Sequence, residues 1–274
     1  MGLSVNKNFS FAGVAALSLA FTATPVVSAE YSDEDLARSL ANPVASLISV
    51  PLQYNYDEKL GPGDAGSVSR LNIQPVIPFP IHEDWNLITR TIVPLVDLKD
   101  FPVKGRSTSG LSDTVASQFL SPTRPTAGGW IWGAGPVWLL PTATDDLLGT
   151  EKWGAGPTAV ALKQEGRWTV GMLANHIWSF AGESDRDDVN ATLLQPFVSY
   201  ITPTMTTISM NTESTYDWDA EAWSVPVNFT VAQLLKVRGQ IFQIAVGARY
   251  WAESTDNGAE DWGARVALTF LFPR

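Results

Sequence analysis

The chain has 274 residues, a formal net charge of −10, two histidines and no cysteine. The missing cysteines exclude a disulfide framework and a thiolate metal site, and the acidic charge argues against nucleic-acid binding, which uses basic patches. The charged fraction of 17% is low for a soluble domain, while eleven tryptophans is a high count.

The first 29 residues have the three regions of a signal peptide. Lys7 gives a positive start, residues 9–23 are apolar, and Val27-Ser28-Ala29 ends the segment with small residues. An uncleaved membrane anchor is the alternative, but the apolar run is short of the roughly 20 residues that a spanning helix needs. We therefore predict cleavage after Ala29, which removes Lys7 and changes the net charge to −11. The rest of the chain has no apolar run long enough for a transmembrane helix, so the exported protein is either soluble or a β-barrel.

Residues 30–43 precede the first predicted strand. Ser32 and Asp35 have the spacing of a capping box, and Leu36 and Leu40 follow on one helical face. This pattern predicts a short periplasmic helix, placed under or in the lower mouth of the structure that follows.

From residue 44 the sequence alternates with period two and is broken every 10 to 15 residues by turn residues. It predicts twelve strands, at 44–54, 67–79, 85–96, 111–120, 130–141, 153–163, 168–179, 191–201, 206–215, 223–233, 240–252 and 262–272. An even number of antiparallel strands is typical of a single-chain outer-membrane barrel. Because lipid offers no partner for a free strand edge, the sheet must close. The fold prediction is therefore an all-β, antiparallel transmembrane β-barrel over residues 44–274.

The connections between these strands alternate in length. The short ones are 80–84, 164–167, 202–205 and 234–239, and the long ones are 55–66, 97–110, 142–152, 181–190, 216–222 and 253–261. The connection 121–129 is an exception, since it has middling length where a short turn is expected. Short periplasmic turns and longer outer loops are typical of bacterial barrels. Several long loops are acidic, but none has calcium-loop spacing, so solvated loops are favoured over a metal or cationic-ligand site, and no cofactor is expected.

Tryptophan and proline add one observation for the barrel and one against it. Four tryptophans lie toward the short-turn ends of the strands and six toward the long-loop ends, as in the aromatic belts of a membrane protein: Trp85, Trp130, Trp132 and Trp168, then Trp138, Trp153, Trp178, Trp223, Trp251 and Trp262. Core tryptophans of a soluble protein would be scattered along the strands. Prolines also occur inside predicted strands, where they cannot donate to the ladder, and we expect bulges or kinks there. These include Pro51, Pro75, Pro94, Pro157 and Pro226.

With the apolar face turned to lipid, polar residues face a narrow lumen, since twelve strands fall between filled eight-stranded barrels and wide porins. The candidates for contact with a solute are Arg70, Arg90, Glu213, Asn228, Gln243, Arg249 and Arg265. Arg249 and Arg265 are expected nearly opposite one another across a hairpin, and Arg70 and Glu213 at similar heights. Two interpretations stay open: an arginine clamp for a carboxylate or phenolate, or a structural network neutralised by Glu213 and loop acids. Polar barrel interiors are common, which favours the second.

An enzymatic role has little support in the sequence. The two histidines are His82, in a short turn, and His176, which alternates with apolar residues on its strand. A hydrolase would use His176 with Ser179 or Asn175, but a catalytic base needs a third group to orient it. No catalytic residue and no metal ligand is predicted.

Five segments resemble one known family: LANPVASLISVP (40–51), WNLITRTIVP (85–94), LLPTATDDLLGTEKWGAGPTAVALKQEGRW (139–168), NHIWSFAG (175–182) and YWAESTDNGAEDWG (250–263). The chain is similar there to outer-membrane transporter-like proteins named for the meta-pathway of phenol degradation. The resemblance covers nearly all of the chain after residue 29. It implies a barrel and the passage of aromatic or other hydrophobic small molecules, and it assigns no binding residue.

Three functions follow, in order of preference. The first is an outer-membrane channel for a small aromatic or hydrophobic solute, the second a structural or surface-interaction barrel with a filled lumen, and the third an outer-membrane hydrolase. The expected partners are outer-membrane lipid and lipopolysaccharide, the solute, and the machinery that inserts barrels. No nucleic acid is expected.

Overall fold

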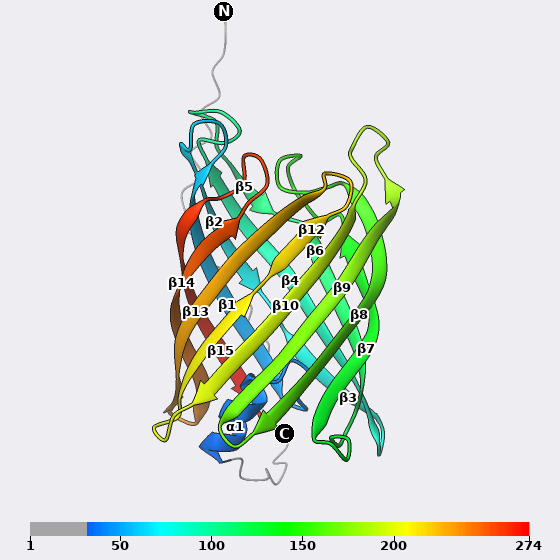
Figure 1. The fold of residues 1–274 in the computed structure, drawn as a ribbon, viewed down its shortest axis with the longest axis vertical. Helices are drawn as coiled ribbons and strands as arrows, with labels where there is room; N and C mark the ends of the chain where they lie inside the picture. Colours follow the sequence, from blue (N-terminus) through cyan, green and yellow to red (C-terminus); the bar gives the residue numbers. More distant parts are fainter. Residues whose placement is uncertain (1–31, 274) are drawn as a thin grey trace, which may run out of the picture.

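The computed structural model describes residues 32–273, so the predicted signal peptide, residues 1–29, lies outside the described part. One helix and fifteen strand segments form an upright barrel whose strands are tilted to its axis (Figure 1). The elements are α1 (Asp33–Leu40), β1 (Ile48–Leu60), β2 (Gly66–Ile73), β3 (Val76–His82), β4 (Trp85–Lys99), β5 (Thr108–Leu111), β6 (Thr114–Pro122), β7 (Trp130–Leu140), β8 (Lys152–Glu165), β9 (Trp168–Gly182), β10 (Asn190–Ile201), β11 (Thr206–Thr212), β12 (Ser214–Asp217), β13 (Ala222–Val237), β14 (Gln240–Glu253) and β15 (Asp261–Phe272). No helix in the described range is long and apolar enough to cross a membrane.

The sheet closes by antiparallel pairing of its first and last strands. The β1–β15 register runs from Ile48↔Phe272 to Tyr56↔Ala264 without a shift. Three predicted strands are each interrupted once, which splits them into β2 and β3, β5 and β6, and β11 and β12. Counted as single strands, these pairs give the predicted twelve-stranded barrel, and every ladder edge has a partner.

The predicted start and end of the first strand were wrong. Residues 44–47 precede β1, and Val44 and Leu47 are buried outside the sheet. At its other end β1 continues to Leu60, through Asn55 and Asp57, which the sequence placed in a loop. Both side chains are almost completely buried. Polar residues in this stretch therefore continue the inward face of a strand instead of marking a solvated turn.

The alternation of short and long connections is confirmed for most of the barrel (Figure 1), but the predicted long loop 216–222 shortens to 218–221, which is no longer than the short connection 202–205. Two residues join β8 to β9 and two join β13 to β14, at the same end of the barrel as α1 (Figure 1). Longer connections, such as 100–107 and 141–151, gather at the opposite end. The connection 123–129 lies at the short-turn end despite its length. We call the two ends the short-turn mouth and the long-loop mouth.

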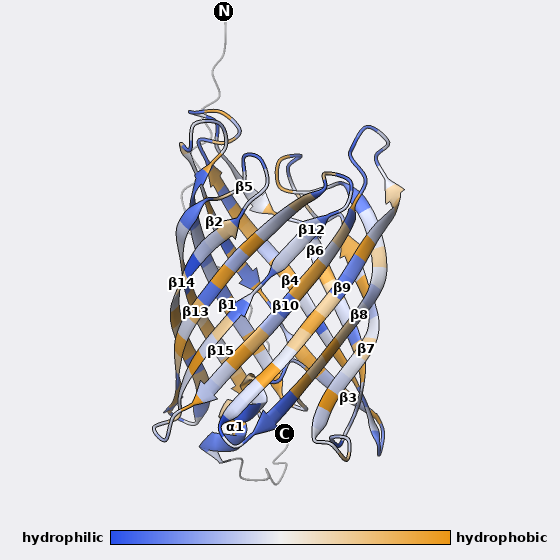
Figure 2. Cartoon of the chain, in the orientation of Figure 1, coloured by the Kyte–Doolittle hydropathy of each residue, from blue (hydrophilic) through white to orange (hydrophobic). Residues whose placement is uncertain are grey.

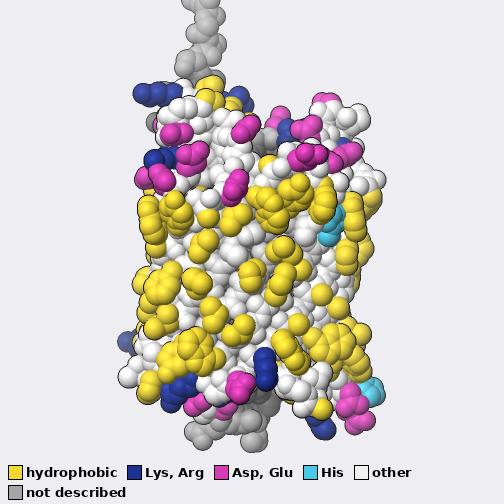
Figure 3. Space-filling model, viewed as in Figure 1, with side chains coloured by type: hydrophobic (Ala, Val, Ile, Leu, Met, Phe, Trp, Pro, Cys, Tyr) yellow, Lys and Arg dark blue, Asp and Glu magenta, His cyan; other side chains and the backbone are white. Residues whose placement is uncertain are grey.

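The outer surface of the barrel is apolar between two charged rims (Figures 2 and 3). Nine tryptophans keep between 37% and 66% of their surface exposed, which places them on this outer face as belt residues would be. Trp251 is the correction. Residues two apart on a strand lie on the same face, so Trp251 turns inward like Arg249 on β14. The Arg249 guanidinium lies over its ring, 5.0 Å from the ring centroid.

The repeated pentapeptide WGAGP explains where two prolines fit. Its copies lie on β7 and β8 and meet only at their last residues, where Pro136 is paired to Pro157. In each copy the glycine before the proline is pressed against the next strand: a Cβ on Gly135 would lie 2.1 Å from the Gln118 oxygen, and one on Gly156 1.7 Å from the His176 oxygen. The ladders β6–β7 and β8–β9 omit pairs at these points. Elsewhere Pro75 separates β2 from β3 and Pro226 lies at a bulge, whereas the register runs unshifted through Pro51 and Pro94.

Residues 32–47, the plug segment, fill the short-turn mouth. Ser32 caps α1 by accepting a 3.1 Å hydrogen bond from the Asp35 amide. Leu36 and Ala37 are fully buried, and Leu36 packs with Leu234 and Leu271 of the barrel wall. The plug segment is also held by an Asp33–Lys236 ion pair and by the bond from Arg38 to a turn carbonyl. Burial of its apolar face against the wall fixes its position.

Candidate functional site

The inner face of the barrel has two chemically different walls. Strand pairing turns polar side chains inward on β1, β2 and β11–β15, which form the polar wall: Gln53, Asn55, Asp57, Arg70, Asn72, Ser209, Asn211, Glu213, Asn228, Arg249 and Arg265. On β4 and β6–β10 the inward residues are mainly aliphatic and form the apolar wall: Ile88, Ile92, Val115, Phe119, Leu139, Val160, Leu173, Ile177, Leu193 and Phe197. A solute in the lumen therefore meets hydrocarbon on one side and hydrogen-bonding groups on the other.

Three of the hollows that the described residues line lie along this interior. The largest, the central cavity, measures about 410 Å³ and is bounded by both walls, including Arg90, Leu173, Leu193 and Glu213. Two smaller hollows, of about 200 and 250 Å³, lie between the plug segment and the wall. Arg90, Leu173 and Gln195 line both the central cavity and the first smaller hollow. The plug segment therefore narrows the path from the central cavity to the short-turn mouth.

Arg265 and Glu213 form the strongest contact on the polar wall. The two terminal nitrogens of Arg265 donate to the two Glu213 carboxylate oxygens at 3.1 and 2.9 Å, and Nε donates to Asn55 Oδ1 at 2.7 Å. The Arg265 side chain is only 6% exposed. Glu213 is at the break between β11 and β12, where its own amide donates to the Pro226 carbonyl. All three Arg265 donor groups are occupied, and Glu213 has both oxygens bonded.

A second ion pair lies nearer the long-loop mouth. Arg249 Nη1 is 3.4 Å from the Asp57 carboxylate, and both side chains are 4% exposed. Asp57 also accepts a 3.0 Å hydrogen bond from the indole of Trp251. Asp57 and Trp251 were missed as site residues because the sequence assigned one to a loop and the other to the membrane belt. The parity of Gln53, Asn55 and Asp57 was the signal that could have placed Asp57 inward.

Arg90 and Arg70 differ from these two arginines. Arg90 Nη2 donates to Gln74 Oε1 at 2.8 Å, and Gln74 is 95% buried. Within residues 32–273, no carboxylate oxygen forms an ion pair with Arg90 or Arg70. Arg70 is exposed to the lumen and does not border the central cavity, whereas Arg90 does.

The structure places all seven sequence candidates on the inner face and specifies the pairings that the sequence left approximate. Arg249 is opposite Gly263 and Arg265 is opposite Gly247, so the two arginines are offset along the hairpin. Glu213 is bonded to Arg265 and not to Arg70. Of the other candidates, Gln243 borders both hollows at the plug segment, and buried Asn228 has an Oδ1 atom without a hydrogen-bond partner in the described range. The network interpretation fits Arg249 and Arg265, and it does not extend to Arg90.

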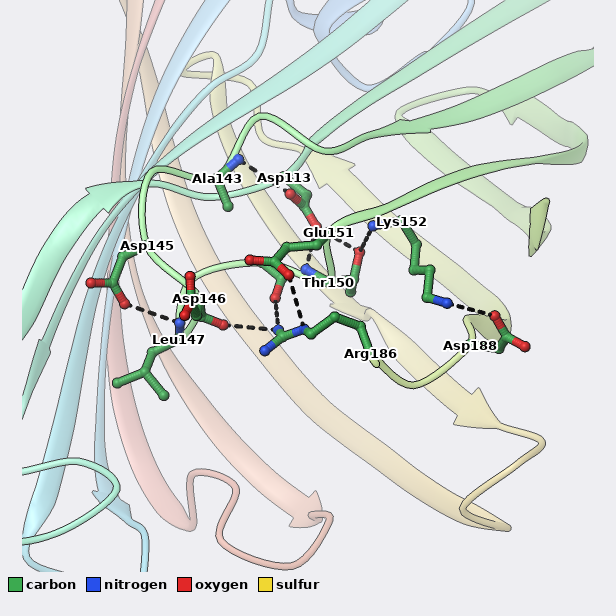
Figure 4. A network of polar contacts seen from close by, with 11 residues as sticks. Asp113, Ala143, Asp145, Asp146, Leu147, Thr150, Glu151, Lys152, Arg186 and Asp188 are labelled. Carbon is green, nitrogen blue, oxygen red and sulfur yellow. Dashed lines mark hydrogen bonds and ion pairs between the residues drawn. The ribbon is translucent and has the colours of Figure 1, made fainter. Parts of the chain in front are cut away.

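The long-loop mouth is covered by residues 141–151, which we call the capping loop (Figure 4). Asp113 anchors it by accepting hydrogen bonds from the Thr150 amide at 2.6 Å, the Thr150 hydroxyl at 2.8 Å and the Ala143 amide at 3.3 Å. Arg186 binds two of its carbonyls and pairs with Glu151. Leu148 is buried in a cluster with Val68 and Leu98 from other strands. The loop therefore reaches over the lumen.

The loop acids around this network have shifted proton affinities. Hydrogen bonds from Lys152 and Ser179 lower the pKa of Asp188. The Leu147 amide and the Thr108 hydroxyl lower the pKa of Asp145, while burial raises the pKa of Glu151. The two lowered carboxylates are thus stabilised in their charged form by the loop geometry.

The residues of a hydrolase do not come together. His176 faces outward, where its Nδ1 lies 2.7 Å from the Thr192 hydroxyl and its ring stacks on Trp178. Ser179 has the opposite parity and donates to Asp188 at the mouth. Asn175 lines the central cavity. His176 and Ser179 are therefore on opposite faces of the same strand.

Comparisons with known proteins agree with this architecture. No protein-family model matches the sequence, and no curated protein matches it. Among solved structures, an outer membrane channel from Pseudomonas putida F1 is similar with a TM-score of 0.64 at 15% identity, covering 83% of this chain and 96% of that one. The fold is that of an outer-membrane β-barrel. Looser matches are the NanC porin (TM-score 0.48, 11% identity, covering 81% and 98%) and outer membrane phospholipase A from Escherichia coli (0.49, 8%, 88% and 98%). The closed wall and its apolar outer band put the protein in a bacterial outer membrane.

Proposed function

We propose that this protein is an outer-membrane channel for a small solute with an apolar body. The observation that carries the proposal is the central cavity of about 410 Å³, bounded on one side by aliphatic residues and on the other by polar ones. The lumen of a water-filled porin is polar and would not need an aliphatic wall. A barrel filled by side chains would not leave a cavity of this volume. Binding pockets for small molecules combine these features: mostly apolar lining with a few placed polar groups.

The size of the lumen limits the solute. Twelve strands leave a narrow interior, and the plug segment and the capping loop narrow it further. The resemblance to the family named for phenol degradation is in line with an aromatic or other hydrophobic solute. In this proposal lipid and lipopolysaccharide surround the outer band, and the barrel-insertion machinery assembles the protein.

Leu193 and Leu194 offer a matched pair of variants for a test. Leu193 borders the central cavity, while its neighbour on β10 has the opposite parity and faces lipid. We expect Leu193→Trp to fill part of the cavity and to reduce the uptake of a radiolabelled small aromatic compound severalfold in cells that depend on this protein for it. Leu194→Trp should leave uptake near the wild-type rate. Equal uptake by both variants and by cells without the protein would refute the channel.

The alternative is a surface barrel with a closed lumen. It is favoured by the plug segment and the capping loop, which occupy the two mouths. Purified protein in planar bilayers separates the two functions. A channel gives measurable ion conductance that Leu193→Trp lowers, whereas a closed surface barrel is electrically silent in both forms.

A further inference from the structure

The charges facing the middle of the lumen do not balance. Four arginines and two carboxylates project inward there: Arg70, Arg90, Arg249 and Arg265, with Asp57 and Glu213. Both carboxylates are engaged, by Arg249 and Arg265 respectively. Among the described residues this leaves Arg70 and Arg90 without a carboxylate at ion-pair distance. An unpaired cation in a partly desolvated space attracts an anion more strongly than one in bulk water.

Arg90 is the one of the two that borders the central cavity. It projects from β4, next to the apolar wall, and the Gln74 amide oxygen holds one of its terminal nitrogens at 2.8 Å. Gln74 is itself fixed, because it is 95% buried and its backbone amide donates to the Pro51 carbonyl at 2.9 Å. None of the Arg90 nitrogens is both buried and unsatisfied, so the remaining donors are accessible from the hollows that Arg90 lines, which include the central cavity. By contrast, Arg249 Nε is buried without a partner and cannot be reached.

Aliphatic side chains line much of the rest of the central cavity that Arg90 borders. Leu173, Ile177 and Leu193 come from β9 and β10, and Val115 and Leu139 from β6 and β7. A molecule bound to Arg90 would therefore extend its other end over hydrocarbon. Among residues 32–273, Glu213 is the only carboxylate that borders this cavity, and both of its oxygens accept from Arg265. An amine would find no free acceptor of comparable strength.

We propose that Arg90 binds the carboxylate of an amphipathic solute whose aromatic or aliphatic body packs on the apolar wall. The planar guanidinium fork matches a carboxylate with two parallel hydrogen bonds, and Gln74 sets its orientation. This proposal rests on the channel function and narrows its substrate class to organic monocarboxylates. Arg90 is thus a specificity-determining residue of the lumen.

The test compares 4-phenylbutanoate with its uncharged amide, 4-phenylbutanamide. At pH 7 the acid is fully ionised, so the two probes share one shape and differ in charge. Binding is measured by calorimetry on the full barrel in lipid nanodiscs. We expect the wild type to bind the carboxylate at least about tenfold more tightly than the amide. Arg90→Gln should bring the two affinities within about twofold, and Arg90→Lys should recover part of the difference because it keeps the charge and loses the fork.

Arg124→Gln is the matched control, since Arg124 is exposed in the connection 123–129. It should keep the wild-type preference. Equal affinities of the wild type for the two probes, or an unchanged preference in Arg90→Gln, would overturn the proposal. If Arg90→Gln does not fold, the wild-type comparison and Arg90→Lys decide.

Failure of the channel and failure of this site give different results. If Leu193→Trp blocks uptake of both probes while Arg90→Gln leaves the uptake and binding of both unchanged, the channel stands and the carboxylate site is refuted. If wild-type cells take up neither probe but Arg90 controls binding, the carboxylate site stands and transport is refuted.

Discussion

Arg265 on β15 reaches Glu213, at the break between β11 and β12, with both terminal nitrogens, at 3.1 and 2.9 Å. Strands β13 and β14 lie between them in the sheet, so the two side chains meet through the interior of the barrel and not between neighbouring strands. Glu213 lies between the inward-facing Asn211 and Thr215, so alternation along the chain also turns its carboxylate inward at this break. Since both partners are well bonded, the pair fixes the cross-section of the lumen as well as its charge.

Removing one member of this pair should destabilise the barrel. Glu213→Ala leaves the nearly buried Arg265 with Asn55 as its remaining partner, at an expected cost of about 2–4 kcal/mol in the free energy of unfolding. Urea unfolding in lipid vesicles measures this. The exposed pair Lys163–Glu165 is the control, and Glu165→Ala should change the value by less than about 1 kcal/mol. An equal effect of both variants would show that the Arg265–Glu213 pair adds no more to the free energy of unfolding than an exposed ion pair does.

The plug segment should be separable from the barrel. Leu36 is fully buried between α1 and the wall, and α1 contributes no strand to the sheet. Leu36→Asp places a charge in this apolar contact, so we expect the segment to leave the mouth and single-channel conductance to rise severalfold. Glu34→Gln, which removes only a surface pair with Arg38, should conduct like the wild type. An unchanged conductance in Leu36→Asp would mean that the plug segment does not limit the path.

Asp113 should control the order of the capping loop. Asp113→Ala removes the acceptor of three hydrogen bonds, two from Thr150 and one from Ala143. The loop then exposes the bond after Lys152, and we expect trypsin to cut there faster than in the wild type by about tenfold, corresponding to about 1.4 kcal/mol of lost local stability. Asp187→Asn, an exposed acid of the neighbouring loop, should leave the rate unchanged. Wild-type protection in Asp113→Ala would contradict the anchoring role.

The loop 183–189 should loosen in acid. Because its bonds from Lys152 and Ser179 lower the pKa of Asp188, this stabilisation is complete above the ordinary aspartate pKa and is lost as the pH falls through the lowered value. The chain has no cysteine, so Asp187→Cys accepts a single spin label. We expect the label to begin to gain mobility as the pH falls below the ordinary aspartate pKa of about 4, and to be fully mobile only below the lowered pKa. With Asp188→Asn added, it should be mobile at pH 7 as well, and a label that is rigid there would count against this contact.

Gly156 should be intolerant of any side chain. A Cβ there would lie 1.7 Å from the His176 carbonyl oxygen, so β8 and β9 must separate to admit it. Gly156→Ala is expected to cost about 1–3 kcal/mol and to lower the folded fraction on a heat-modifiability gel. Gly128 has its nearest neighbour at 3.5 Å and no positive φ, so Gly128→Ala should fold like the wild type. Similar folded fractions for the two variants would contradict the close approach.

Much of the site could be placed from parity alone. The seven candidate residues face the lumen because period two fixes which side of a strand each residue occupies. The predicted positions were wrong where the residue type outweighed the alternation. Asn55 and Asp57 are residue types typical of loops, and Trp251 is typical of a membrane belt. The apolar wall was also missed, because strands β6, β7 and β8 are apolar or small on both faces and their alternation is weak.

By itself the sequence determined a closed twelve-stranded barrel, since alternation, turn residues and loop lengths are local properties of the chain. Only the tertiary structure decided which arginines are neutralised. Arg265 meets Glu213 and Arg249 meets Asp57 across the interior, at separations along the chain that no local pattern encodes. The same holds for the plug segment and the capping loop, whose positions depend on burial against distant strands. Closing the sheet brings these groups together, and that closure leaves Arg90 facing the central cavity without a carboxylate at ion-pair distance among the described residues.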